Sequence, residues 1–158
     1  MIAPKPTKYK GCIYRSRLEA TWAAFFDRVG WKYQYEPFDL CGWVPDFILF
    51  GFGNDDILVE VKPYSSFNDF VVNKVTKKIA LACEDDTRTV LLVGCSVCID
   101  SAYTLDGIPL ASIGWFKPKA KAQGYIIASL GSPNVAQVKK IYAESQNLTR
   151  WRPPRYDG

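Results

Sequence analysis

The chain has 158 residues, 48% apolar and 15% aromatic, which is enough for one compact domain with its own core. It contains no histidine, which excludes serine triads, papain-like sites and histidine-bound metals in their usual forms. The net charge of +4 is uneven: residues 1–17 carry five basic and no acidic groups, residues 18–116 carry seven basic and fourteen acidic, and residues 117–158 carry eight basic and two acidic. Cationic ends suit a polyanionic partner, although solvated basic termini are also common.

The first ten residues are basic and interrupted by proline, without the apolar centre of an export signal, and no apolar run approaches the ~20 residues of a membrane span. Five cysteines at irregular spacing argue against a disulfide framework. Cys95 and Cys98 have CxxC spacing, but without histidine or a second CxxC we interpret them as reduced residues at a strand end. We therefore expect a cytoplasmic, intracellular protein with no membrane partner.

The first half of the chain predicts a helix followed by three strands. Apolar residues recur at helical spacing between Ser16, the expected N-cap, and Gly30, the expected stop. Residues 31–36 alternate aromatic and polar side chains and end at a proline, which indicates a strand. A turn-rich segment then separates two apolar runs and predicts a β-hairpin with strands at residues 43–50 and 57–62.

The second half of the chain predicts further helices and strands. We expect a loop at residues 63–68 and an amphipathic helix at residues 70–83. Residues 89–94 are almost all apolar, as in a strand that is buried on both faces. The remaining predicted elements are strands at residues 112–117 and 125–130, a helix at residues 134–147 and an extended basic tail.

This order of elements predicts an α/β fold with a single domain over residues 1–158. Its core would have the order α-β-β-β-α-β, with a mixed central sheet flanked by helices, over residues 14–95. A C-terminal β-β-α addition at residues 110–148 and a basic tail at residues 149–158 would follow. The sequence contains no internal repeat.

The predicted hairpin brings two carboxylates together. With the turn centred on Gly53, Asp46 would face Glu60 across the two strands. Opposed residues have Cβ atoms about 4.5–5.5 Å apart, and like charges there are destabilising unless a cation neutralises them. Lys62 would lie on the same face as Glu60, ~6.8 Å along the strand, whereas the Val61 side chain would point into the core.

These groups form a candidate metal site. The carboxylates of Asp46 and Glu60 and the carbonyl of Val61 are oxygen ligands of the kind that Mg²⁺ or Mn²⁺ uses, with waters and a phosphate oxygen to complete the set. The metal would activate a water and stabilise charge on phosphorus, and the Lys62 ammonium would orient that water or stabilise the transition state. Glu-x-Lys and Pro-Asp are each common patterns, so a purely structural role is the alternative.

The joint pattern resembles the motif of the PD-(D/E)XK nuclease superfamily: Pro45-Asp46, then an apolar strand, a turn and Glu60-Val61-Lys62. Residues 14–20 and 33–37 are similar to a phage-encoded, resolvase-like and TnsA-like subset of these endonucleases. The resemblance covers residues 14–95 and implies a restriction-endonuclease-like core, a divalent metal and hydrolysis of phosphodiester bonds.

The resemblance also implies a fourth site residue. Similar nucleases often add an acidic residue from the first helix to the metal site, and Glu19 stands at the matching place. Ser16 and Glu19 have the spacing of a capping box as well, in which Glu19 would accept a hydrogen bond from the Ser16 amide. The roles of metal ligand and helix cap both stay open and are compatible with each other.

Seven basic residues are candidates for contacts with nucleic acid. They lie before and at the start of the first helix, on one face of the helix after the motif, which borders the substrate groove in the superfamily, and in the tail. Plain solvated charge is the alternative for each group. The candidates are Arg15, Arg17, Lys74, Lys77, Lys78, Arg150 and Arg152.

We therefore expect a Mg²⁺-dependent endonuclease that hydrolyses DNA, with branched or nicked recombination intermediates as candidate substrates. RNA is left open, because backbone contacts carry no sequence information. Two alternatives stand beside this expectation: a catalytically silent module that binds nucleic acid or protein, and a nuclease subunit that is active only in a larger recombination or transposition assembly. A homodimer would suit the cleavage of two strands. The resemblance to phage proteins implies a phage-infected host cell as the setting.

Overall fold

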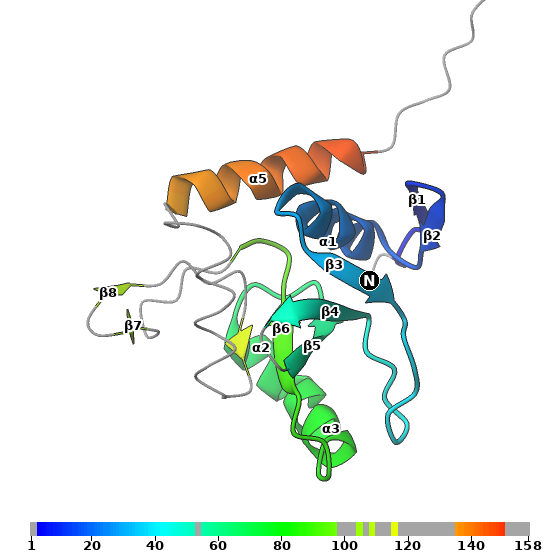
Figure 1. Cartoon of the computed structure of the whole chain (residues 1–158), viewed down its shortest axis with the longest axis vertical. Coiled ribbons are helices and arrows are strands. Elements are labelled where there is room, and N and C mark those ends of the chain that lie inside the picture. The colour runs from blue at the N-terminus through cyan, green and yellow to red at the C-terminus, as the bar shows by residue number, and fades with distance from the viewer. Residues whose placement is uncertain are drawn as a thin grey trace, which may run out of the picture.

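The computed structural model describes residues 3–52, 55–97, 104–105, 108–109, 115–116 and 135–150. At its centre lies one sheet with the strand order β3-β4-β5-β6-β9 (Figure 1). β6 runs parallel to β5, and the other neighbouring strands are antiparallel, so the sheet is mixed, as predicted. The strands are β3 (Lys32–Tyr35), β4 (Phe47–Phe52), β5 (Asp55–Val61), β6 (Thr89–Val93) and the two-residue β9 (Trp115–Phe116).

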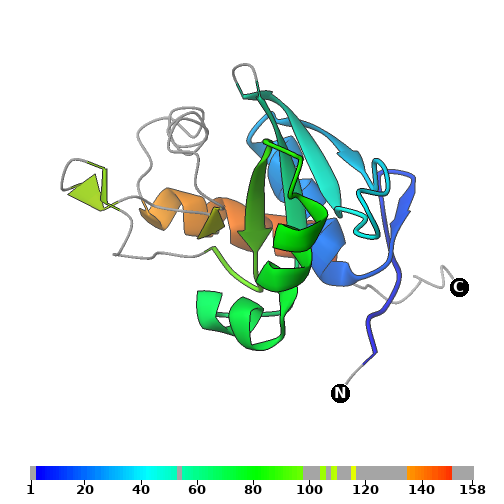
Figure 2. The same ribbon diagram turned by 90° about the horizontal axis from the view of Figure 1, so that it is seen from below.

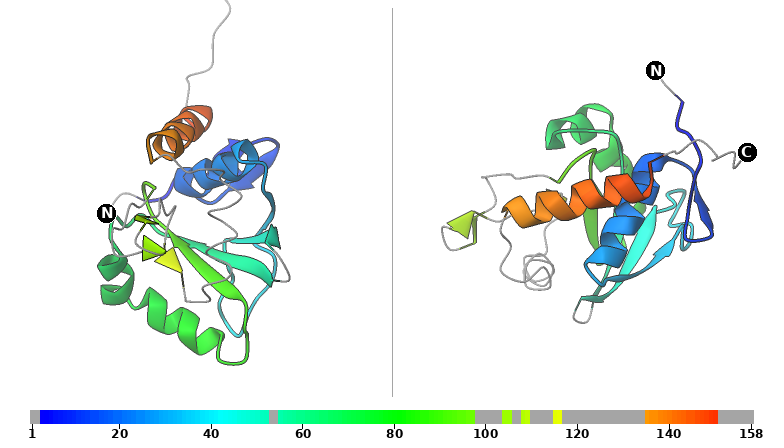
Figure 3. Two further views of the ribbon diagram at one scale, coloured as in Figure 1. Left: turned by 60° about the vertical axis from the view of Figure 1, so that its left-hand side comes forward. Right: turned by 90° about the horizontal axis from the view of Figure 1, so that it is seen from above.

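Helices cover both faces of this sheet, which gives three layers (Figure 3). α1 (Arg17–Arg28) and α5 (Val135–Leu148) lie on one face, and α2 (Phe67–Val72) and α3 (Val75–Ala82) lie on the other. Side chains alternate along β4, so Phe47 and Leu49 join the core beneath α1, whereas Ile48 joins the core beneath α3. The prediction of a mixed α/β fold with helices flanking the sheet is confirmed.

α1 forms where the sequence predicts it. Ser16 Oγ accepts a hydrogen bond from the Glu19 amide at 3.1 Å, and Glu19 Oε2 accepts one from the Ser16 amide at 3.0 Å, which completes the capping box. Gly30, with φ +77°, follows the helix in the left-handed conformation that commonly ends one. The fully buried rings of Trp22 and Phe26 each stabilise the fold by about 1.5–3 kcal/mol and anchor the middle and end of α1 in the core.

The β4–β5 hairpin has the predicted register. Three residue pairs between β4 and β5 have the register that places residue 46 opposite residue 60. The pairing shifts between Leu49 and Phe52, where Gly51 has φ +86°, as in a β-bulge. β4 begins later than predicted because Trp43 pairs with Leu40 in an isolated bridge. The three pairs are Phe47 with Val59, Ile48 with Leu58, and Leu49 with Ile57.

The prediction of one helix over residues 70–83 is wrong, because the chain forms α2 and α3 instead. Asn73 ends α2, and its Nδ2 donates to the Asp69 carbonyl at 2.8 Å. Lys74 then has φ +60°, a left-handed conformation that cannot continue a right-handed helix. α2 also begins inside the expected loop at residues 63–68, since Ser66 Oγ caps it by accepting from the Asp69 amide at 3.3 Å.

The N-terminal region forms a hairpin that the sequence analysis did not predict. It consists of β1 (Thr7–Tyr9) and β2 (Cys12–Tyr14), and it lies beside α1 (Figure 2). Lys10 and Gly11 connect the strands with φ values of +46° and +80°, the pattern of a two-residue type I′ turn. In the sequence, the feature that indicates this hairpin is a glycine between two short runs that each contain a tyrosine.

α5 confirms the helix predicted at residues 134–147, and it packs along α1. The rings of Tyr142 and Trp22 have centroids 5.1 Å apart, and the hydroxyls of Thr21 and Thr149 are 2.9 Å apart. A further short hairpin joins β7 (Thr104–Leu105) and β8 (Ile108–Pro109).

Several predictions fall largely or wholly outside the described residues. Of the strand predicted at residues 112–117 the structure describes β9 alone, and the strand at residues 125–130 and the tail after residue 150 are not described. Cys95 forms no disulfide with another described residue, and Cys98 lies outside them. In the described part of the chain, no helix has the length and apolar character needed to cross a membrane.

Candidate active site

Asp46 and Glu60 lie together at the base of one groove. Asp46 directly precedes β4 and donates its amide to the Val59 carbonyl at 2.9 Å, while Glu60 lies within β5. The two residues are only 4% and 7% exposed. Both line a groove of about 1280 Å³. The structure thus brings together the two acids that the hairpin register paired.

The Asp46 carboxylate contacts one amide and one cation. Its Oδ2 accepts a hydrogen bond from the Val61 amide at 2.7 Å, and its Oδ1 is 3.5 Å from Arg15 Nη2. Burial raises the pKa of Asp46 well above the usual range of an aspartate, and the charge of Glu60 raises it further, whereas the Val61 hydrogen bond lowers it. The ionised form of Asp46 would therefore be favoured by an added cation.

The Glu60 carboxylate has two different donors. Trp43 Nε1 donates to Oε2, and Lys62 Nζ is 3.4 Å from Oε1. Burial raises the pKa of Glu60, while the Trp43 hydrogen bond, the charge of Lys62 and the charge of Lys78 lower it. An indole can only donate, so Trp43 favours the ionised carboxylate and fixes its orientation.

Lys62 and Val61 have the orientations that strand alternation predicts. Lys62 follows β5, and its amide donates to the Val93 carbonyl at 3.1 Å, which holds the residue beside β6. Its side chain is 38% exposed and pairs with Glu60. The Val61 side chain is buried in the core beneath α1, and the residue also lines the groove. The Lys62 ammonium is therefore available to a molecule in the groove.

Glu19 has the capping role, and a ligand role for it stays a prediction. In addition to the Ser16 amide, its Oε2 accepts a hydrogen bond from the Tyr35 hydroxyl at 3.0 Å. Glu19 is buried, lines the groove and contributes to the raised pKa of Asp46. Among the residues that the structure describes, no group of three or more Asp, Glu, Cys or His side chains could hold a metal ion. A metal role for Asp46 and Glu60 therefore stays a prediction as well.

Basic side chains surround the two acids. They come from segments far apart in the sequence: the N-terminal segment, the residue before the Ser16 cap, the start of α1, the residue after β5, α3, and the segment after α5. A cationic rim around a groove attracts a polyanion. Four of the residues predicted to contact nucleic acid lie in this rim, together with Lys5 and Lys8, for which no such contact was predicted. Arg152 lies outside the described residues. The rim residues are Lys5, Lys8, Arg15, Arg17, Lys62, Lys78 and Arg150.

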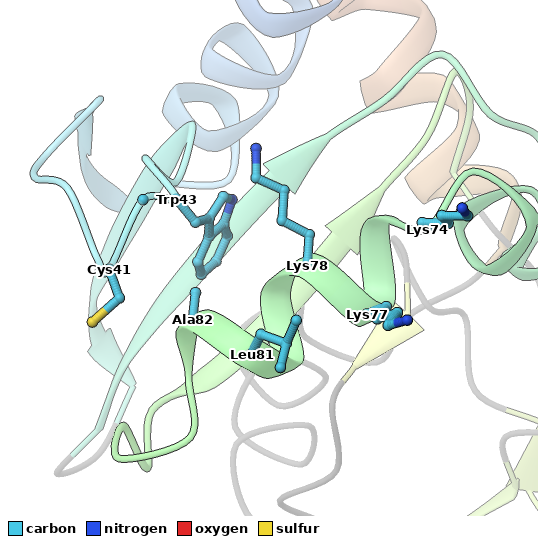
Figure 4. A pocket seen from close by; sticks show the side chains of 8 residues that line it. Cys41, Trp43, Lys74, Lys77, Lys78, Leu81 and Ala82 are labelled. Carbon is cyan, nitrogen blue, oxygen red and sulfur yellow. The ribbon is translucent and has the colours of Figure 1, made fainter.

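The structure separates the three lysines of the predicted helix. A neighbouring pocket of about 430 Å³ lies between α3 and the segment around Cys41 and Trp43. Lys78 extends towards Trp43, whereas Lys74 and Lys77 extend in other directions (Figure 4). Lys78 lines both the pocket and the groove, whereas Lys74 and Lys77 line the pocket alone.

Sequence reasoning did not single out Trp43 and Tyr35 as site residues. A buried indole N–H usually has an acceptor, and Trp43 stands three residues before Asp46, which is a usable signal. Tyr35 ends the aromatic alternation of β3, and its hydroxyl lies between the Arg15 amide and Glu19 Oε2, a long-range contact that strand alternation does not predict.

Comparisons with protein-family models, curated proteins and solved structures gave no match. The fold and the site define a mixed α/β domain with a buried pair of carboxylates beneath a basic groove.

Proposed function

We propose that the protein is a metal-dependent nuclease that hydrolyses phosphodiester bonds in DNA, with Asp46, Glu60 and Lys62 at its active site. The observation that carries the proposal is the burial of two carboxylates side by side at the base of a groove with a cationic rim. The sheet register and both raised pKa values support it, because burial disfavours the ionised form of each carboxyl and a bound cation would stabilise that form.

The donor set fits Mg²⁺ or Mn²⁺. Mg²⁺ usually keeps several waters and binds through one or two carboxylates plus substrate phosphate, so two acids are sufficient. Asp46 and Glu60 would hold the ion, and the Val61 carbonyl is the candidate backbone ligand. When bound, the metal would supply Lewis-acid stabilisation of the phosphoryl group and lower the pKa of a bound water.

The chain's own residues would bind and orient the substrate. The rim would attract the phosphate backbone and hold it over the two acids. Trp43 keeps Glu60 oriented, and Lys62 presents a positive charge where negative charge develops on the phosphate during hydrolysis. Lys62 is close enough to Glu60 to act on the same phosphate that approaches the carboxylates.

The test is incubation of the purified protein with plasmid, linear duplex, four-way junction DNA and single-stranded RNA, in Mg²⁺, Mn²⁺ or EDTA. We expect metal-dependent cleavage of at least one DNA substrate. Asp46→Asn, Glu60→Gln and Lys62→Met should abolish it. Lys10→Met removes a surface cation that pairs with Asp27 outside the groove, and it should keep the activity. Equal cleavage by the wild type and the three site variants, or no cleavage at all, would reject the proposal.

A catalytically silent binding module is the second candidate, because each acid already has a cationic partner. Arg15 contacts Asp46, and Lys62 contacts Glu60. Such a module would bind DNA without cleaving it and would take up no Mn²⁺ in calorimetric titration. Metal uptake with cleavage only after addition of partner proteins would instead indicate a subunit of a larger assembly.

A further inference from the structure

Arg15 has a backbone that is held in place and a side chain that is largely exposed. It lies between β2 and the cap residue Ser16, where its amide donates to the Tyr35 hydroxyl at 3.1 Å. That hydroxyl donates in turn to Glu19 Oε2 at 3.0 Å. The side chain is 66% exposed. The guanidinium can therefore change partners without any rearrangement of the fold.

The guanidinium contacts two carboxylates unequally. Its Nε is 2.6 Å from Glu36 Oε1, which is the distance of a charge-assisted hydrogen bond. Its Nη2 is 3.5 Å from Asp46 Oδ1, a looser contact to the far more buried acid. Glu36 thus holds the arginine at the edge of the groove, beside the acid that is proposed to bind the metal.

The same position is suitable for recognition of a phosphate. An arginine has five N–H donors in a planar fork, which matches the oxygens of a phosphodiester, and the ion pairs with Glu36 and Asp46 use Nε and Nη2. Arg15 lines the groove, so a phosphate that reaches Asp46 would lie within reach of the guanidinium. A cation at Asp46 and the Arg15 guanidinium, however, would repel each other at this range.

We propose that Arg15 binds the substrate phosphate in this site and that its guanidinium competes with the metal for Asp46. Without metal, the arginine contacts Asp46. When a metal takes Asp46, the guanidinium turns to a phosphodiester oxygen of the substrate. Metal and DNA then bind cooperatively, because the metal releases a donor that the DNA uses. This inference rests on the proposed function and adds to it an order of events at the same acid.

The test compares DNA affinity with and without a divalent ion in wild type, Arg15→Ala and Arg17→Ala. The probes are a fluorescein-labelled single strand and a labelled duplex, measured by anisotropy in EDTA and in Ca²⁺, with denaturing gels to show that the probes stay intact. Arg15→Ala should weaken binding roughly tenfold in Ca²⁺ and much less in EDTA, where Asp46 competes with the DNA phosphate for the guanidinium.

Arg17→Ala is the matched control. Arg17 also lines the groove, but its Nη2 donates to the Gln146 carbonyl at 3.2 Å rather than to an acid of the site. Its removal should weaken DNA binding by a similar factor in both buffers. A calorimetric titration with Mn²⁺ alone supplies the second readout: Arg15→Ala should bind Mn²⁺ several-fold more tightly than wild type, because the competing cation is gone.

Each result decides the inference. The inference is overturned if Arg15→Ala weakens DNA binding equally in EDTA and Ca²⁺, or if its Mn²⁺ affinity equals that of the wild type. The proposed function still stands in that case, provided that the wild type binds metal and DNA. If the wild type binds neither Mn²⁺ nor DNA, the proposed function and this inference fail together.

Discussion

Replacement of Asp46 by asparagine should stabilise the metal-free protein near neutral pH. Burial and the charge of Glu60 raise the pKa of Asp46, so ionisation of this carboxyl works against the folded state. The pKa of Asp46 is raised to about 8, and a rise of one in a pKa corresponds to about 1.4 kcal/mol. The exposed Arg15 partner offsets at most about 1 kcal/mol, and asparagine keeps an acceptor for the Val61 amide. We expect a gain of about 1–2 kcal/mol, or about 3–6 °C in Tm for a domain of this size.

The sign of the pH dependence follows from the raised pKa. The stability that Asp46 contributes is fully present below its unfolded pKa of about 4, and it is lost as the pH rises through the folded value. The advantage of Asp46→Asn should therefore vanish near pH ~4 and grow towards neutral pH. Thermal unfolding followed by circular dichroism in EDTA, across this range, measures it.

Asp27→Asn is the control for this experiment. Asp27 accepts hydrogen bonds from the hydroxyls of Tyr9 and Tyr33 at 2.8 and 3.2 Å. Loss of its charge weakens these bonds, so this variant should be less stable than wild type. An Asp46→Asn protein that melts below wild type in EDTA, or a difference that is independent of pH, would refute the reasoning.

Three further predictions concern the neighbours of Asp46. Mn²⁺ should raise the Tm of wild type but not of Glu60→Gln in thermal unfolding, and an equal rise in both would locate the ion elsewhere. Trp43→Phe removes the donor that lowers the Glu60 pKa, so calorimetry should find that Mn²⁺ binding needs a higher pH; an unchanged pH profile would contradict this role of the indole. Glu19→Gln should cost about 0.5–1 kcal/mol in denaturant unfolding by weakening the capping box, whereas a large loss of Mn²⁺ affinity would make Glu19 a metal ligand.

The parts of the site that the sequence predicted depend on short-range signals. Ser16 and Glu19 are three residues apart on one helix, and Asp46 and Glu60 are joined by a single hairpin whose turn determines the register. The break between α2 and α3 has no such signal, because Lys74 is a good helix former and its left-handed conformation depends on the surrounding fold.

The rim of the groove was only partly predictable, for a different reason. Lys5 and Arg150 lie at opposite ends of the sequence and share a groove because α5 packs along α1. That packing includes the hydrogen bond between the hydroxyls of Thr21 and Thr149. Periodicity within one sequence identifies the apolar face of each helix but not which helix it meets.

The Asp46 side chain has a structural role beside its proposed role in catalysis, because its Oδ2 accepts a hydrogen bond from the Val61 amide. It closes the edge of the β4–β5 ladder, where the carboxylate stands in for a backbone carbonyl. An alanine at this position would leave a buried amide without an acceptor, at a cost of about 1–3 kcal/mol, whatever became of the chemistry. Selection for the fold alone would therefore retain aspartate or asparagine at position 46. Only the difference between these two residues reports on the need for charge.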